Sequence, residues 1–165
     1  MKLTTLHDLM LHELKDVYSA ERQLAQALPV MAKKVTSDEL RAAMETHLEE
    51  TEEHIERLKR VFELVGVAPR SQKCTGMEGL IAEGRDLAEE DIEDELLDAG
   101  LIAAAQRIEH YEIAAYGKLC EYASALGLND VRDILNSTLE EEKKTDKLLT
   151  KLAEGGINAL AMANR

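Results

Sequence analysis

The chain has 165 residues with two prolines, one Phe and no Trp, a length and composition typical of a single helical domain with a real core. Asp and Glu outnumber Lys and Arg by 33 to 20, which gives a formal net charge of −13 at pH 7. This balance argues against a nucleic-acid-binding protein, which needs a basic face, and suits a protein that attracts cations.

The first residues lead directly into an amphipathic helix, without the apolar region of a secretory signal, and no stretch reaches the length of a membrane span. The two cysteines, Cys74 and Cys120, match no metal-knuckle or disulfide spacing. We therefore expect a cytoplasmic protein with reduced thiols and no membrane partner.

Apolar residues at helical spacing predict four long helices, over about residues 5–34, 38–65, 93–126 and 129–154. Pro29 falls inside the first helix, but the apolar series continues to Met31, so we expect the helix to continue through it. Short connections join the first helix to the second and the third to the fourth, which predicts two antiparallel hairpins.

Residues 66–92 form the connection between the two hairpins and contain a short predicted helix over 77–87. This segment is long enough to cross the bundle from end to end. Residues 155–165 are predicted to be a loosely held tail. The expected fold is all-α: a single domain, residues 1–165, that forms a ferritin-like four-helix bundle with one long crossover connection.

The apolar seams of the four helices are interrupted near their middles by acids and histidines. Ionised carboxylates enter such a seam only when something opposite compensates their charge, because desolvation costs several kcal/mol. Carboxylates and imidazoles at one level of a bundle can together bind hard or borderline cations; the alternative is pairing with Lys or His, or exposure after a rotation of the helix. The candidate metal ligands are Glu21, His47, Glu50, His54, Glu109, Glu112 and Glu142.

Di-metal bundles take one Glu from each of two helices and Glu-x-x-His from each of the other two, and this sequence departs from that pattern. Thr145 stands where the fourth helix would carry its His. In the second helix Glu50 lies beside the strict seam, whereas its two histidines lie within it. We expect Glu109 or Glu112 to bridge the two metals. The neighbouring acids Glu140 and Glu141, on a densely charged flank, are expected to pair with Lys or His or to be solvent-exposed.

Several runs resemble the YciE/YciF-like bacterial family of the ferritin-like superfamily, and the likeness extends over about residues 5–153. The Glu-x-x-Glu of the third helix also resembles the corresponding helix of rubrerythrin-type proteins. The runs that carry the family likeness are His47–Thr51, Met77–Ile81, Leu101–Gln106, Glu109–Ala114 and Thr138–Lys143.

The resemblance implies a ferritin-like bundle, often a homodimer, in a stress-associated protein with a di-iron or related centre. It supports as ligands the five glutamates at positions 21, 50, 109, 112 and 142, and offers no precedent for His54. The family has no established activity, so whether the chain is an enzyme stays open.

The leading functional expectation is a metal-binding protein that takes iron, or manganese, and reacts with oxygen or peroxide. The alternative is a non-enzymatic stress or interaction protein with a vestigial site, which the missing histidine of the fourth helix suggests. A third interpretation, an iron-storage cage, would be excluded by a dimer.

Overall fold

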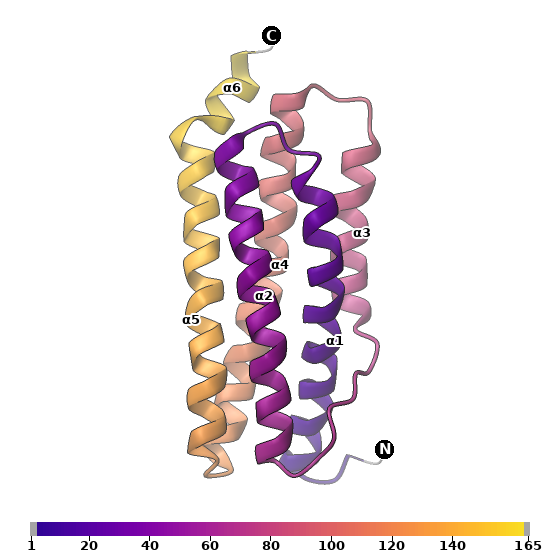
Figure 1. Ribbon diagram of the computed structural model, residues 1–165, viewed down its shortest axis with the longest axis vertical. Helices are drawn as coiled ribbons and strands as arrows, with labels where there is room; N and C mark the ends of the chain where they lie inside the picture. Colours follow the sequence, from indigo (N-terminus) through magenta and orange to yellow (C-terminus); the bar gives the residue numbers. More distant parts are fainter. Residues whose placement is uncertain (1–2, 164–165) are drawn as a thin grey trace.

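The computed structural model describes residues 3–163, which form a bundle of long helices with no strand among them (Figure 1). None of the helices in this part of the chain is long and apolar enough to cross a membrane. In chain order the elements are α1 (Leu6–Ala32), α2 (Asp38–Leu64), α3 (Thr75–Glu89), α4 (Asp94–Ala125), α5 (Asn129–Leu152), the π-helical turn η1 (Ala153–Ile157) and α6 (Asn158–Ala163).

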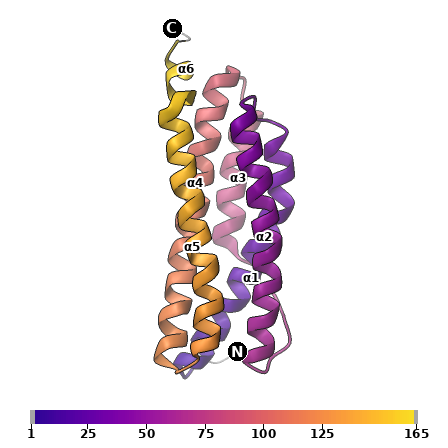
Figure 2. The ribbon, with the colours of Figure 1, turned by 60° about the vertical axis from the view of Figure 1, so that its left-hand side comes forward.

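Two antiparallel hairpins, α1 with α2 and α4 with α5, lie side by side (Figures 1 and 2). The segment between α2 and α3 runs back along α1, to which the Gln72 N–H donates at the Lys15 carbonyl oxygen over 3.1 Å. Helix α3 then packs against α1 and α4 and carries the chain to the end of the bundle where α4 begins. The predicted four-helix bundle with one long crossover and a short extra helix is confirmed.

Local sequence signals set the helix ends. Thr5 caps α1 in a reciprocal box, because its hydroxyl accepts from the Asp8 N–H at 3.0 Å while the Asp8 carboxylate accepts from the Thr5 N–H at 3.0 Å. Gly66 and Gly127 follow α2 and α4 with φ of 74° and 71°, a conformation in which a Cβ atom would be strained. Pro29 lies inside α1, as predicted.

The tail expected over residues 155–165 is helical in the part that the structure describes. The chain turns through η1, where Gly156 has φ of 160°, and continues as α6. Ile157 is only 7% exposed and packs into the apolar core. One buried isoleucine therefore holds this segment against α4, a contact that the Ala-rich composition did not reveal. Residues 164–165 lie outside the described residues.

Asp98 of α4 fastens the turn between α1 and α2. Its buried carboxylate accepts from the Thr36 N–H at 2.9 Å, the Thr36 hydroxyl at 2.8 Å and the Ser37 N–H at 2.8 Å. We expect Asp98→Ala to lower the free energy of unfolding by about 1–3 kcal/mol, because buried donors lose their acceptor. Urea denaturation checks this; Asp98→Asn, which keeps one acceptor oxygen, should lose less, and an Ala variant as stable as the parent protein would contradict the expectation.

The core is divided along the bundle axis. One apolar cluster includes Leu28, Met44 and Leu149, and the other includes Leu14 and Phe62. Between the two lies a layer of buried polar side chains contributed by the four long helices. This layer contains the acids and histidines that interrupt the seams.

Candidate metal centre

Six ionisable side chains from four helices meet in the polar layer, and none is more than 4% exposed. Helix periodicity places them there: Glu109 and Glu112 are three residues apart, and His47 and His54 are seven apart, so each pair shares one face of its helix. The contributions are Glu21 from α1, His47 and His54 from α2, Glu109 and Glu112 from α4, and Glu142 from α5.

These six side chains form two overlapping groups with the spacing of metal ligands. One group holds His47, Glu109, Glu112 and Glu142, and the other holds Glu21, His54 and Glu142; within each group the donor atoms lie within 4.8 Å of one another. Glu142 belongs to both groups. The bridge by Glu109 or Glu112 stays a prediction, and the grouping adds Glu142 as a second candidate for a shared carboxylate.

Many of these atoms lie close together without hydrogen bonding. The Nε2 of His47 is 3.1 Å from Oε1 of Glu109, and Nδ1 of His54 is 3.0 Å from Oε1 of Glu142, yet these nitrogens lack hydrogen-bond geometry, as do both oxygens of Glu112 and of Glu142. Buried polar atoms are nearly always hydrogen-bonded. Buried carboxylate and imidazole atoms that lie within 4.8 Å of one another and lack hydrogen bonds form an arrangement that a cation would complete.

The electrostatics of the layer favour retained protons when no cation is bound. Burial, together with the charges of Glu142 and Glu21, raises the pKa of Glu112 well above its usual value. Burial also raises the pKa of Glu142 to about 8, although the nearby imidazole of His54 opposes the shift. Burial opposes the charged form of His54, but its close interactions with the carboxylates of Glu142 and Glu21 outweigh this effect and raise the pKa of His54 to about 10. Metal ions would compete with these protons.

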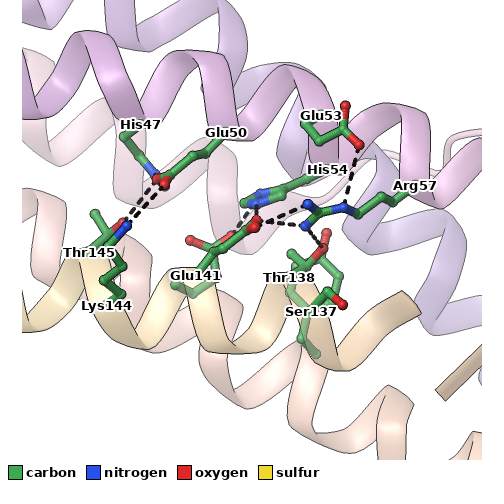
Figure 3. Close-up of polar contacts among 12 residues, drawn as sticks. His47, Glu50, Glu53, His54, Arg57, Ser137, Thr138, Glu141, Lys144 and Thr145 are labelled. Carbon is green, nitrogen blue, oxygen red and sulfur yellow. Dashed lines mark hydrogen bonds and ion pairs between the residues drawn. The ribbon is translucent and has the colours of Figure 1, made fainter. Parts of the chain in front are cut away.

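The other nitrogen of His54 is held from outside the layer, as Figure 3 shows. Its Nε2 lies 2.8 Å from Oε2 of Glu141, and Arg57 donates to the two oxygens of the same carboxylate at 2.6 and 3.0 Å. A carboxylate that accepts from one ring nitrogen fixes a ligating histidine with the other nitrogen toward the metal. Glu141 therefore orients Nδ1 of His54 toward Glu21 and Glu142.

This role of Glu141 was missed from the sequence. The side chain of Glu141 is 30% exposed and contacts both His54 and Arg57 across the α2–α5 interface. Pairing with a histidine is one of the two alternatives expected for this flank, but its role in orienting His54 was not predicted. The available signal was Arg57, which lies three residues after His54 and therefore on the same face of α2, where it could pair with the same acid as His54. Glu140, in contrast, is exposed as expected.

The remaining candidates lie at the edge of the layer. The side chain of Glu50 is 23% exposed, its Oε2 is 3.9 Å from Nδ1 of His47, and it belongs to neither ligand group. The Thr145 hydroxyl, which stands where a histidine was expected, donates to Glu50 at 3.5 Å. The buried Tyr116 hydroxyl donates to Glu21. The side chain of His110 is 69% exposed, and its Nε2 lies 3.3 Å from Oδ1 of Asp146.

Comparisons with known proteins agree with this architecture. The family model described as a domain of unknown function, DUF892, matches residues 5–162. Protein YciF of Escherichia coli K12 is 44% identical over 162 residues, which is 98% of each chain.

Two solved structures are also similar. The crystal structure of the E. coli stress protein YciF superimposes with a TM-score of 0.91 over 94% of this chain and 99% of that chain. YcfI of Rhodopseudomonas palustris, 42% identical, superimposes with a TM-score of 0.89 over 90% and 95% of the two chains. Matched over nearly its whole length by the family model and by a relative at 44% identity, the chain belongs to the DUF892 family, within the ferritin-like superfamily.

Proposed function

We propose that this protein binds two iron ions in the buried layer, with manganese as the alternative metal, and that the loaded centre reacts with a small oxidant, dioxygen or peroxide. The observation that carries the proposal is the convergence of unpartnered carboxylate and imidazole atoms from four helices on one buried space. A stress-associated role is proposed with it, since the homologous YciF is described as a stress protein.

The donor set supports two divalent cations. It holds four carboxylates, Glu21, Glu109, Glu112 and Glu142, and two imidazoles. Four negative charges match the charge of two divalent ions, and neutral imidazoles add nitrogen ligands that suit iron. The total of four glutamates and two histidines equals that of the ferritin-like di-metal bundles. Its distribution differs, because both histidines come from α2. When bound, the metals would supply electrons for reaction with the oxidant.

Anaerobic loading with ferrous iron, followed by desalting and elemental analysis, tests the proposal. About two metal ions per chain are expected. Fewer than one bound ion per chain would refute it. Manganese loading of the same preparation measures which metal the site prefers.

Metal affinity should rise with pH. The metal-free protein holds protons on Glu142, whose pKa is raised to about 8, and on His54, whose pKa is raised to about 10, and a cation must displace them. We expect manganese to bind more tightly at about pH 8 than at about pH 6, with protons released on binding. Calorimetry in two buffers of different ionisation enthalpy measures that release; an affinity and enthalpy independent of pH and buffer would contradict the expectation.

The second candidate is a non-enzymatic stress or interaction protein with a vestigial site. It is favoured by the ion pairs His47–Glu109 and His54–Glu142, which can neutralise part of the layer without a metal. Under this alternative Glu21→Gln would leave stress survival intact in cells that carry the variant. Loss of survival with an unchanged melting temperature favours the metal centre.

A cytoplasmic homodimer is proposed as well, from the family resemblance. Size-exclusion chromatography with light scattering tests the oligomeric state. A large assembly would instead favour an iron-storage cage.

A further inference from the structure

An apolar cavity borders one half of the candidate metal centre. It has a volume of about 20 Å³ and lies between α1, α2, α4 and α5. His47, Glu109 and Thr145 form its wall on the side of the polar layer, and residues such as Leu28, Met44, Ile108 and Leu149 form the rest. The cavity therefore lies between the apolar core and one ligand group.

The chemistry of the wall excludes stable water. None of the lining residues exposes a polar atom to the cavity, although two of them are ionisable. A cavity of 10–15 Å³ has room for about one water molecule, but water needs two to four polar partners, and apolar cavities stay dry and take up apolar ligands such as xenon. This space is suited to a small apolar molecule.

The two halves of the candidate centre differ in the polarity of their surroundings. Around His54 the surroundings are polar and hydrogen-bonded, with Glu141, Arg57 and the Tyr116 hydroxyl in place. Around His47 the neighbouring space is apolar and open to a ligand, and both ring nitrogens lack a hydrogen-bond partner. A small molecule in the core therefore meets the centre at the His47 half.

We propose that this cavity binds dioxygen and delivers it to the His47–Glu109 side of the centre. Hydrogen peroxide would have to give up its hydrogen bonds to water with no replacement in the cavity, a cost of several kcal/mol that dioxygen does not bear. The cavity thus selects dioxygen as the oxidant class. Delivery to a metal rests on the proposed function, whereas binding of an apolar gas does not.

Xenon binding to the metal-free protein tests the site itself. Under xenon pressure, methyl NMR signals of Leu28, Ile108 and Leu149 should shift and saturate. Ala105→Leu, which adds carbon atoms at the cavity wall, should abolish these shifts, and Ala103→Leu, at an exposed position of the same helix, should retain them. Absence of saturable shifts in the parent protein, or equal shifts in the Ala105→Leu variant, would overturn the proposal.

A cavity-enlarging variant covers the case in which Ala105→Leu does not fold. Leu149→Ala removes part of the wall and should increase xenon affinity, because the space grows while remaining apolar. Unchanged or weaker xenon binding in a folded Leu149→Ala protein would equally count against the cavity.

Oxidation of the ferrous-loaded protein tests delivery. We expect Ala105→Leu to slow oxidation by dioxygen about tenfold or more, a range typical of one excess methylene in a pocket, and to leave oxidation by peroxide unchanged, with Ala103→Leu slowing neither. If Ala105→Leu slows oxidation by dioxygen and by peroxide equally, or slows neither reaction, selection of dioxygen by the cavity is contradicted. If no iron is bound, the proposed function fails, and the xenon result alone still decides whether the gas site exists.

Discussion

Replacement of Glu142 by glutamine is expected to abolish binding of both metals. Glu142 is the one residue shared by the two ligand groups, and an amide neither carries the charge nor coordinates as a carboxylate does. Glu21→Gln and Glu109→Gln each alter a single group, so each should remove about one metal per chain. Elemental analysis after ferrous loading distinguishes these results.

Stability should change in the opposite direction in the metal-free protein. The folded-state pKa of Glu142 is raised from 4.5 to about 8. The free energy of unfolding therefore falls as pH rises from 4.5 to about 8, because the unfolded chain ionises Glu142 while the folded protein keeps it protonated. Glutamine removes that cost. The metal-free Glu142→Gln protein should therefore melt at a higher temperature than the parent above about pH 8 and at a similar temperature near pH 4.5.

Bound metal should reverse the order of the melting temperatures of the parent protein and the Glu142→Gln variant. At a free concentration of 100 times the dissociation constant a ligand stabilises by about 2.7 kcal/mol, which for a domain of this size shifts the melting temperature by about 5–11 °C. The parent protein should gain this shift with manganese and Glu142→Gln should not. Glu140→Gln, at the exposed neighbour on the same helix, is the matched control. A Glu142→Gln variant that still binds two metals would show that Glu142 is not a metal ligand.

Replacement of Glu141 by glutamine is expected to weaken metal binding although Glu141 touches no metal in the proposed centre. Loss of such a supporting carboxylate typically costs about 10–100-fold in metal affinity. The effect should be confined to the Glu21–His54–Glu142 group, because His54 is the candidate ligand that Glu141 contacts and orients. The binding step at this group is therefore expected to weaken, while the group around His47 keeps its affinity.

A spectroscopic measurement separates this orienting role from a purely structural one. Nitrogen NMR of zinc-loaded protein should report His54 as metal-bound through Nδ1 with the proton on Nε2, and Glu141→Gln should change that signal selectively. Glu140→Gln, again the matched control, should leave both affinity and signal unchanged. Equal affinities in the parent and Glu141→Gln proteins would mean that His54 is oriented without its neighbour.

The arrangement of the acids could be predicted from helical periodicity alone. Glu21, Glu112 and Glu142 occupy middle positions of seams whose outer positions are mostly apolar, and the structure buries all three completely. Periodicity fixes the face of a helix and its depth, so it brings such residues to one level. It does not fix which carboxylate is shared, because this depends on the relative rotation and shift of helices joined by long connections.

Contacts between helices that lie far apart in the chain could not be predicted from the sequence. Glu141 lies on a charged flank like that of Glu140, and only the packing of α5 against α2 brings it to His54, 87 residues earlier in the chain. Glu50 stays a predicted ligand from the family resemblance, and its helical position places it at the rim of the layer. The burial of Ile157 likewise depends on a kink at Gly156 that composition does not indicate.

The arrangement of the centre is tested most directly by anomalous diffraction from crystals of the manganese-loaded protein. Two peaks are predicted in the buried layer, one surrounded by Glu21, His54 and Glu142 and the other by His47, Glu109, Glu112 and Glu142, with the Glu142 carboxylate in contact with both. Crystals that show no peak in the layer, with the carboxylates instead paired to His47 and His54, would contradict the existence of a metal centre in this protein.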